Sequence, residues 1–172
     1  MAITAYCYFP GTKLSGGLVE EKKMKEAGAF VVRDYEIGAE NSINIGSISA
    51  GGGAGKATFK ELTVTKTVDG LSCDLFSKLT TGGHYNDMII ELHKAAGSGS
   101  TEPFVKWEFK LVMVQDIAWT GSEYDDETYE TVVLQYGAMK TTYFVGAKKG
   151  KMKKDSSAEW SRILNSAQLA VE

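Results

Sequence analysis

Apolar and charged residues alternate along one stretch of the chain, residues 105–113. The odd positions are apolar and the even positions are mostly charged, which is the period of two expected of a strand with one buried face. A second stretch, residues 129–144, is rich in β-branched and aromatic residues and predicts a long strand that bends at Gly137. Both stretches therefore predict strands, and the first has one face in water.

Four shorter segments also have the composition of strands, and each is followed by Gly, Ser, Asn or Asp residues that indicate turns. They are residues 3–9, 30–37, 58–68 and 88–94. The chain contains 19 Gly but only 2 Pro, as expected of a sheet protein with many tight turns.

One segment between the strands has the pattern of an amphipathic helix. The apolar residues of segment 72–79 fall on one helical face, and either Asp69 or Ser72 can cap the first turn. Gly82 and Gly83 then end the helix, because glycine readily adopts the left-handed conformation that follows a helix C-terminus.

Two other segments are less distinct. Residues 18–27 are highly charged and predict a solvated excursion between the first two strands, with a short charged helix as the alternative. Residues 157–169 place Trp160, Ile163 and Leu164 at helical spacing, but a short final strand fits the same residues, so both structures stay open for this tail.

Many strands, one convincing helix and no alternation of strands with helices predict a mainly β fold. The expected architecture is an antiparallel β-barrel or two-sheet sandwich with one short α-helix packed on one side. The 172 residues are 43% hydrophobic and 24% charged, which is typical of a globular domain. We therefore expect residues 1–172 to form a single domain.

The overall charge argues against nucleic acid as a partner. The chain has 19 Lys and Arg against 22 Asp and Glu, a formal net charge of −3, whereas nucleic-acid binders usually carry a positive excess. Apolar stretches such as residues 111–114 are far too short for a membrane span, and no signal peptide is recognisable. We expect synthesis in the cytoplasm and, if the protein is exported, a route that accepts it folded.

Residues 49–58 resemble a phosphate-binding loop but depart from its pattern. Ala50 stands where that pattern requires Gly, and Ala57 stands where it requires the hydroxyl that holds magnesium. The following residues predict a strand, whereas a phosphate-binding loop opens a helix. The segment is therefore interpreted as a connecting loop, and no nucleotide cofactor is expected.

The residues that most often carry catalysis form no recognisable pattern. His84 follows a glycine turn and His93 lies on a predicted strand with Glu91, but no triad or zinc signature accompanies them. Cys7 and Cys73 are interpreted as small buried hydrophobic residues. We therefore expect no catalytic residues and rank an acid–base enzyme using His84 or His93 last.

An acidic cluster precedes the long strand, but its spacing does not match a calcium loop. Its members are Glu123, Asp125, Asp126, Glu127 and Glu130. Accordingly, no metal is expected.

The long strand lies between one acidic and one basic turn. The acidic turn contains Glu123, Asp125, Asp126 and Glu127, and the basic turn contains Lys148, Lys149, Lys151, Lys153 and Lys154. Successive turns of an up-and-down sheet lie at opposite ends, so copies of the chain can approach head to tail with complementary charge. The alternative interpretation is two solvated turns without a contact role.

Several segments together resemble the Hcp (haemolysin-coregulated protein) family. They are the glycine-rich loop 51–56, the strand 61–68 with its Lys66-x-x-Asp69 pattern, Ser72, Leu75, Gly82 and the pair His84-Tyr85. The order of elements agrees as well. The chain departs from the family in lacking a Trp near Gly38 and a Pro after Ser72, and in the length of segment 18–27.

The resemblance implies a structural role in a bacterial type VI secretion system. Hcp proteins form hexameric rings that stack into a hollow inner tube, which a contractile sheath drives outward behind a VgrG-type spike and which carries effectors in its lumen. It also implies assembly in the cytoplasm followed by secretion without a cleaved signal peptide.

The polar loop 41–55 matches the extended loop with which Hcp proteins reach the neighbouring ring. Its expected contact residues are Ile43, Ile45, Ile48, Gly51, Gly52 and Gly53. Each isoleucine that is buried on another subunit can contribute roughly 1.5 to 3 kcal/mol, whereas a monomer gains little from ordering this loop.

Two functions from different classes follow from the sequence. The leading one is a self-assembling tube subunit without catalysis or cofactors. The second is a secreted monomeric β-barrel that binds a small ligand or a host surface.

Overall fold

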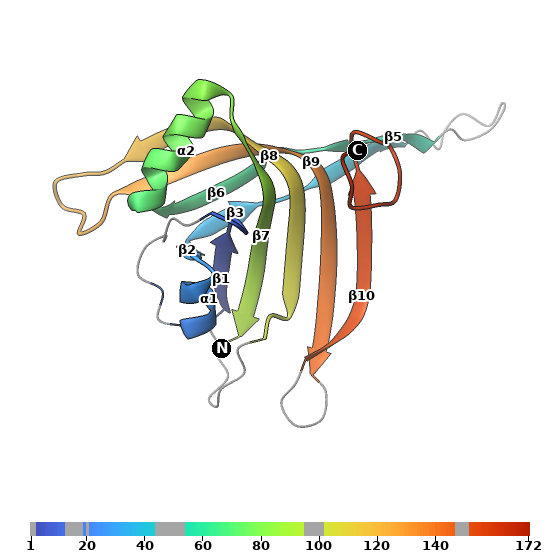
Figure 1. Ribbon diagram of the computed structural model, residues 1–172, viewed down its shortest axis with the longest axis horizontal. Helices are drawn as coiled ribbons and strands as arrows, with labels where there is room; N and C mark the ends of the chain where they lie inside the picture. Colours follow the sequence, from blue (N-terminus) through green and yellow to red (C-terminus); the bar gives the residue numbers. More distant parts are fainter. Residues whose placement is uncertain (1–2, 13–18, 20, 44–53, 95–101, 147–151) are drawn as a thin grey trace.

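The structure is a computed structural model that describes residues 3–12, 19, 21–43, 54–94, 102–146 and 152–172. Ten strands and two helices follow one another in these residues (Figure 1). In chain order they are β1 (Ile3–Tyr8), α1 (Lys22–Glu26), β2 (Phe30–Val32), β3 (Asp34–Glu36), β4 (Ala39–Ile43), β5 (Ala54–Phe59), β6 (Leu62–Thr67), α2 (Gly70–Thr81), β7 (His84–Lys94), β8 (Val105–Thr120), β9 (Tyr129–Gly146) and β10 (Met152–Ser161).

The strands form a nearly closed antiparallel barrel. The main sheet has the order β2-β1-β7-β8-β9-β6-β3, so that β2 and β3, which are consecutive in the chain, stand at its two edges. Arg33 links these strands, and its backbone N–H donates a 2.8 Å hydrogen bond to the carbonyl oxygen of Thr65 on β6. The barrel therefore closes through the continuity of the chain at Arg33. This arrangement confirms the predicted mainly β class.

Strand β9 changes its partner in the middle. Its first part pairs with β6, from Tyr129 to Leu134, and its second part pairs with β10, from Ala138 to Gly146. The change occurs between Leu134 and Ala138, next to the predicted bend at Gly137, and Figure 1 shows β9 as a curved strand. A Cβ atom on Gly137 would lie only 2.8 Å from Cδ1 of Ile163, so the close approach of the C-terminal tail requires glycine here.

The neighbouring strand β8 bends at the same level. Leu111 has a φ of 51°, a backbone conformation that residues other than glycine rarely adopt. It stands between Lys110 and Val112, which pair with Ala138 and Tyr136 on either side of Gly137. The irregularity in β8 therefore lies beside the point where the partner of β9 changes from β6 to β10.

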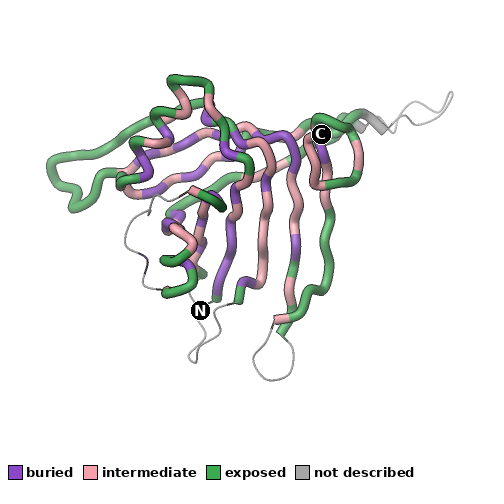
Figure 2. The backbone as a smooth tube through the Cα atoms, in the orientation of Figure 1, coloured by how far each residue is buried: buried purple, intermediate pink, exposed green. Residues whose placement is uncertain are grey.

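The core fills the barrel and extends under α2. Alternate residues of the strands point inward, and Phe109, Met88, Ile90 and Leu134 are among the side chains that are fully or almost fully buried. Figure 2 shows these buried positions alternating along the barrel strands, whereas the tip of the β8–β9 hairpin is exposed throughout. Each such apolar side chain contributes roughly 1.5 to 3 kcal/mol, an upper estimate because unfolded chains are partly compact.

Helix α2 is longer than predicted. It covers Gly70–Thr81, and Asp69 is its N-cap, forming a capping box in which the Ser72 hydroxyl accepts a hydrogen bond from the Asp69 backbone N–H. Gly82 ends the helix with a φ of 71°, as expected. Cys73 on this helix is exposed, so its predicted burial is wrong, because it faces away from the side that carries Leu71 and Leu75. Cys7 is buried as predicted.

Segment 18–27 is not the predicted solvated excursion, and the alternative, a short charged helix, is confirmed. It contains the short helix α1, and Met24 is only 1% exposed. Met24, Val19 and Ala29 form a small apolar cluster against Tyr6 and its neighbours on the outer face of the barrel. The sequence gives little sign of this cluster, because Met24 is the one buried residue of α1 and its neighbours in the helix are all charged.

Several strand boundaries also differ from the expected ones. Segment 58–68 is divided into β5 and β6, and segment 30–37 into β2 and β3. The tail is strand only up to Ser161, after which residues 162–165 form turns. In the part of the chain that the structure describes, no helix is both long and apolar enough to cross a membrane.

Candidate assembly site

The predicted stacking loop lies at the end of a two-stranded hairpin. Strands β4 and β5 pair with each other outside the main sheet, with Ala39 opposite Phe59 and Ile43 opposite Ala54. Figure 1 shows this hairpin projecting from the barrel. Ile43 is the last residue of β4. The other expected contact residues, Ile45, Ile48, Gly51, Gly52 and Gly53, lie outside the described residues.

The described part of the hairpin is largely open to solvent. Glu40, Asn41, Ser42, Lys56 and Thr58 are all exposed. In the part of the chain that the structure describes, β4 and β5 pair only with each other and not with a strand of the main sheet. It therefore offers an accessible surface for contacts with another molecule.

The acidic turn connects β8 to β9 and is held by its own hydrogen bonds. The backbone N–H of Ser122 donates to Asp125 Oδ2 at 3.1 Å, and the N–H of Asp125 donates to the Ser122 carbonyl at 3.2 Å. The Glu127 carboxylate already has a partner within the molecule, because its Oε2 accepts a 2.5 Å hydrogen bond from the Arg33 guanidinium. The side chain of Tyr124 at this turn is 89% exposed.

The basic residues lie at the other end of β9. Lys153 and Lys154 are exposed on β10, opposite Val145 and Phe144. Lys148, Lys149 and Lys151 lie outside the described residues. The acidic and basic turns are thus at opposite ends of β9, as expected. However, β9 curves, so the two hairpins leave the barrel on different sides rather than at opposite poles (Figure 1).

A cleft lies where the β4–β5 hairpin leaves the barrel. It has a volume of about 580 Å³ and is bounded by β5, the bends of β8 and β9, and the start of the tail. Phe59, Met113, Trp160 and Ile163 give it an apolar lining. The sequence showed no sign of this cleft, because it depends on the bend at Gly137.

The cationic groups of this cleft are Lys56 and Arg162, and no carboxylate is among its described lining residues. Arg162 Nη1 donates to the Tyr136 carbonyl at 2.9 Å and to Gln135 Oε1 at 3.1 Å. These bonds hold the guanidinium in place above the Tyr136 ring, 5.1 Å from its centroid. The cleft therefore combines an apolar lining with positive charge.

A buried polar network connects α2 to the barrel. Lys66, only 1% exposed, places its Nζ 2.8 Å from both Glu130 Oε1 and Asp69 Oδ1. Glu130, fully buried, also accepts hydrogen bonds from the Ser72 hydroxyl at 2.7 Å and from Trp119 Nε1 at 2.8 Å. Sequence reasoning missed this network, although the Lys66-x-x-Asp69 pattern was its signal. Glu130 is thus a structural partner of Lys66 and not part of an acidic surface.

The two histidines do not form a common site. His84 and His93 stand at opposite ends of β7, which separates their backbones by roughly 30 Å at about 3.3 Å per residue. Among the described residues, no group of His, Cys, Asp and Glu side chains is arranged to hold a metal ion.

His93 belongs to a small buried cluster with Glu91 and Tyr8. Its Nε2 lies 3.0 Å from Glu91 Oε2, and the Tyr8 hydroxyl donates to Glu91 Oε1 at 3.0 Å. Burial alone would raise the pKa of Glu91, but the hydrogen bonds with His93 and Tyr8 outweigh it and lower this pKa below its ordinary value. The pKa of Tyr8 is raised by burial and by the Glu91 carboxylate. Glu91 is therefore held as a carboxylate within the fold.

Comparisons with known proteins agree with this architecture. A family model described as "Type VI secretion system effector, Hcp" matches residues 11–143. A solved structure described as a type six secretion system protein is 25% identical, with a TM-score of 0.83, and the match covers 97% of this chain and all of that chain. A search of curated protein sequences gave no match.

Two further solved structures share the fold. Hcp1 from Salmonella typhimurium is 21% identical, with a TM-score of 0.72 and coverage of 98% of this chain and 100% of that one. The secreted protein Hcp3 from Pseudomonas aeruginosa is 20% identical, with a TM-score of 0.56 and coverage of 90% and 98%. Because the family model covers most of the chain, this protein belongs to the Hcp family of type VI secretion system proteins.

Proposed function

We propose that this chain forms homohexameric rings that stack through the β4–β5 hairpin and the charged turns into the inner tube of a type VI secretion system. Its place in the Hcp family, a family of structural tube proteins rather than enzymes, carries this proposal. The stacking residues are the hairpin residues Ile43, Ile45, Ile48 and Gly51 to Gly53, together with the acidic and basic turns at the ends of β9.

The open edge of β10 supports contacts between copies. Within the described residues, β10 pairs with β9, and on its other edge the structure shows one bridge, between its last residue Ser161 and Ser166 of the tail, so most of that edge has no strand partner. A strand of ten residues with a mostly free edge is a ready surface for pairing with another chain. Lys153, Lys154 and a register shift before Ser156 interrupt this edge and restrict which partner fits.

The other components follow from the family and not from this chain alone. A contractile sheath would surround the tube, a VgrG-type spike would cap it, and effectors would travel in its lumen. Assembly would take place in the cytoplasm, and the protein would then be found outside the cell. Nothing in this role requires a metal, a cofactor or nucleic acid.

The cleft beside Arg162 favours a second function. A monomeric protein could use this cleft to bind a small apolar anion, because its volume lies in the range of roughly 300 to 1,000 Å³ that is usual for ligand pockets. The oligomeric state distinguishes this function from tube formation.

Light scattering coupled to size-exclusion chromatography, followed by negative-stain electron microscopy, tests the proposal. The expected result is a species of about six times the 18.7 kDa chain mass, with annular particles in end-on view. A protein that remains monomeric at high concentration and low salt would contradict the ring and favour the ligand-binding alternative.

A further inference from the structure

Tyr124 is the most exposed large apolar side chain of the described residues, at 89%. It stands at the tip of the β8–β9 hairpin between Glu123 and Asp125, and Asp126 follows. Hydrogen bonds within the turn hold this tip, including one of 3.3 Å from the Tyr124 backbone N–H to the Ser122 hydroxyl. An aromatic ring presented on an ordered, acidic turn costs little entropy to bury, which is typical of interface anchors.

The cleft beside Arg162 has the complementary properties. It is concave, its lining is apolar at Phe59, Trp160 and Met113, and its charged groups are the cations Lys56 and Arg162. Aromatic rings prefer such an environment, and carboxylates that flank a ring would meet positive charge at the rim. The volume of about 580 Å³ is ample for a phenol ring.

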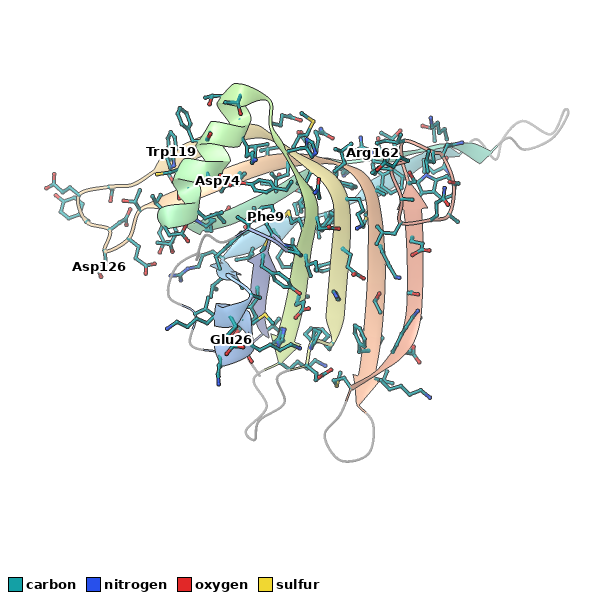
Figure 3. All side chains as sticks on the ribbon, viewed as in Figure 1. Phe9, Glu26, Asp74, Trp119, Asp126 and Arg162 are labelled. Atoms are coloured by element: carbon teal, nitrogen blue, oxygen red, sulfur yellow. The ribbon has the colours of Figure 1, made fainter. Side chains whose placement is uncertain are left out.

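The two features lie on opposite sides of the molecule. In Figure 3 the labelled Asp126 stands at one end of the long axis, and Arg162 stands well toward the other. If the tip of one copy binds the cleft of the next, the contact joins two different surfaces of the chain. Such a contact can repeat from copy to copy, and the copies then form either a closed ring or an open filament.

We propose that the acidic turn of one copy docks in the Arg162 cleft of the next copy, with the Tyr124 ring inserted among the apolar side chains. This inference rests on the proposed self-assembly and names the partner surface of the acidic turn. The cleft fits the turn better than the basic end of β9 does. Lys153 and Lys154 offer charge on an exposed strand, whereas the cleft offers charge and a concave apolar surface together.

Cross-linking between copies tests this contact. In a Cys73→Ser background, the full chain would carry Glu123→Cys, which keeps the Tyr124 ring, with Met113→Cys, which places the second thiol on the cleft wall at a residue that is 42% exposed. A disulfide requires Cα atoms within about 7 Å, so only a docked turn can form it. The matched control combines Glu123→Cys with Lys153→Cys at the basic end. Mild oxidation should give a ladder of covalent oligomers with the first pair and not with the control.

A ladder only with the Lys153→Cys pair, or with neither pair, would overturn the inference. Light scattering of the same samples keeps the proposed function separate, because rings without a cleft cross-link leave ring formation standing and reject only this contact. Thermal melts would show that each variant is folded.

A second measurement does not depend on the engineered thiols. Tyr124→Ala should raise the protein concentration at which half of the chains are assembled at least about tenfold, because truncating an aromatic anchor of an interface usually weakens association by this much or more. Tyr124→Phe, which keeps the ring, should change this concentration less than about threefold. Equal midpoints for wild type and Tyr124→Ala would overturn the proposal, since so exposed a side chain has little role in folding.

Discussion

Lys66 and Glu130 form an ion pair that is almost completely withdrawn from solvent, with Nζ and Oε1 2.8 Å apart. They lie on the paired strands β6 and β9, directly opposite each other in the register. The Ser72 hydroxyl on α2 donates to the same carboxylate oxygen, so the pair also fixes the start of the helix against the barrel. A buried charge without its partner is costly, which makes this pair a sensitive point of the fold.

Replacing only one member of the pair should destabilise the protein strongly. Lys66→Met leaves the Glu130 carboxylate buried without its main cation, and we expect a loss of about 3 to 5 kcal/mol in the free energy of unfolding. The measurement is urea unfolding at a fixed protein concentration, because assembly also affects stability. The double variant Lys66→Met with Glu130→Leu should be more stable than Lys66→Met alone. If the second substitution adds a further loss instead, the two side chains do not act as a pair.

Gly137→Ala should weaken the attachment of the C-terminal tail. The new Cβ would lie 2.8 Å from Ile163 Cδ1 and 2.9 Å from Val171 Cγ1, so both side chains must move. Overpacking of this kind costs about 1 to 3 kcal/mol in the free energy of unfolding. Gly146→Ala, on the same strand with nothing within 4 Å, is the matched control and should stay within about 0.5 kcal/mol. If both variants lose a similar amount of unfolding free energy, the cause is the replacement of a strand glycine as such and not the contact with the tail.

Glu91 should make stability depend on pH in the acid range. Its pKa is lowered in the folded protein, so its contribution is fully present above the unfolded pKa of about 4.3 and is lost as the pH falls through the folded pKa. Chemical unfolding of wild type and Glu91→Gln between pH 7 and pH 3 checks this. The difference between the two proteins should shrink toward low pH. A difference that is constant over this range would show that the Glu91 charge is not responsible.

Reversing the charge of the basic end should affect association between rings. With Lys148, Lys149, Lys151, Lys153 and Lys154 all changed to Glu, we expect shorter filaments and intact rings, and added salt should shorten wild-type filaments similarly. Electron microscopy gives filament length, and light scattering gives ring mass. Filaments of unchanged length under both conditions would remove the basic turn from the stacking contact.

Deleting residues 43–48 should reduce ring stacking before it affects folding. The deletion removes Ile43, Ile45 and Ile48, whereas the barrel core described above is built mainly from residues of the main sheet and α2. Thermal melts of the deletion variant should remain close to wild type, and sedimentation should show rings with few stacks. Tubes as long as those of the wild type would contradict a role of this loop.

Local patterns in the chain were sufficient for the main elements. Alternation along residues 105–113 places β8, and Asp69, Ser72 and Gly82 place both ends of α2, because strand periodicity and helix capping involve residues at most a few positions apart. A bend at Gly137 is predicted for the same reason, since a glycine within a strand pattern is a local signal, and β9 changes its strand partner next to this residue.

Contacts between distant residues were not visible in the chain, because they depend on register. Lys66 and Glu130 are 64 positions apart, and each has the appearance of an ordinary charged strand residue. They come into contact only because β6 pairs with β9 in the register that places Lys66 opposite Glu130, under α2. Cys73 shows the converse, since one step around the helix from Ser72 moves its side chain from the core to solvent.

The amino-acid order alone was enough for the β class, the family resemblance and the charged turns, because these follow from residue types and short spacings. The three-dimensional arrangement decided in which directions the two ends of the curved strand β9 point, and it created the cleft beside Arg162 from four separate stretches of chain. A concave surface exists only once its walls are packed at a definite angle, and this angle comes from the paired bends at Leu111 and Gly137.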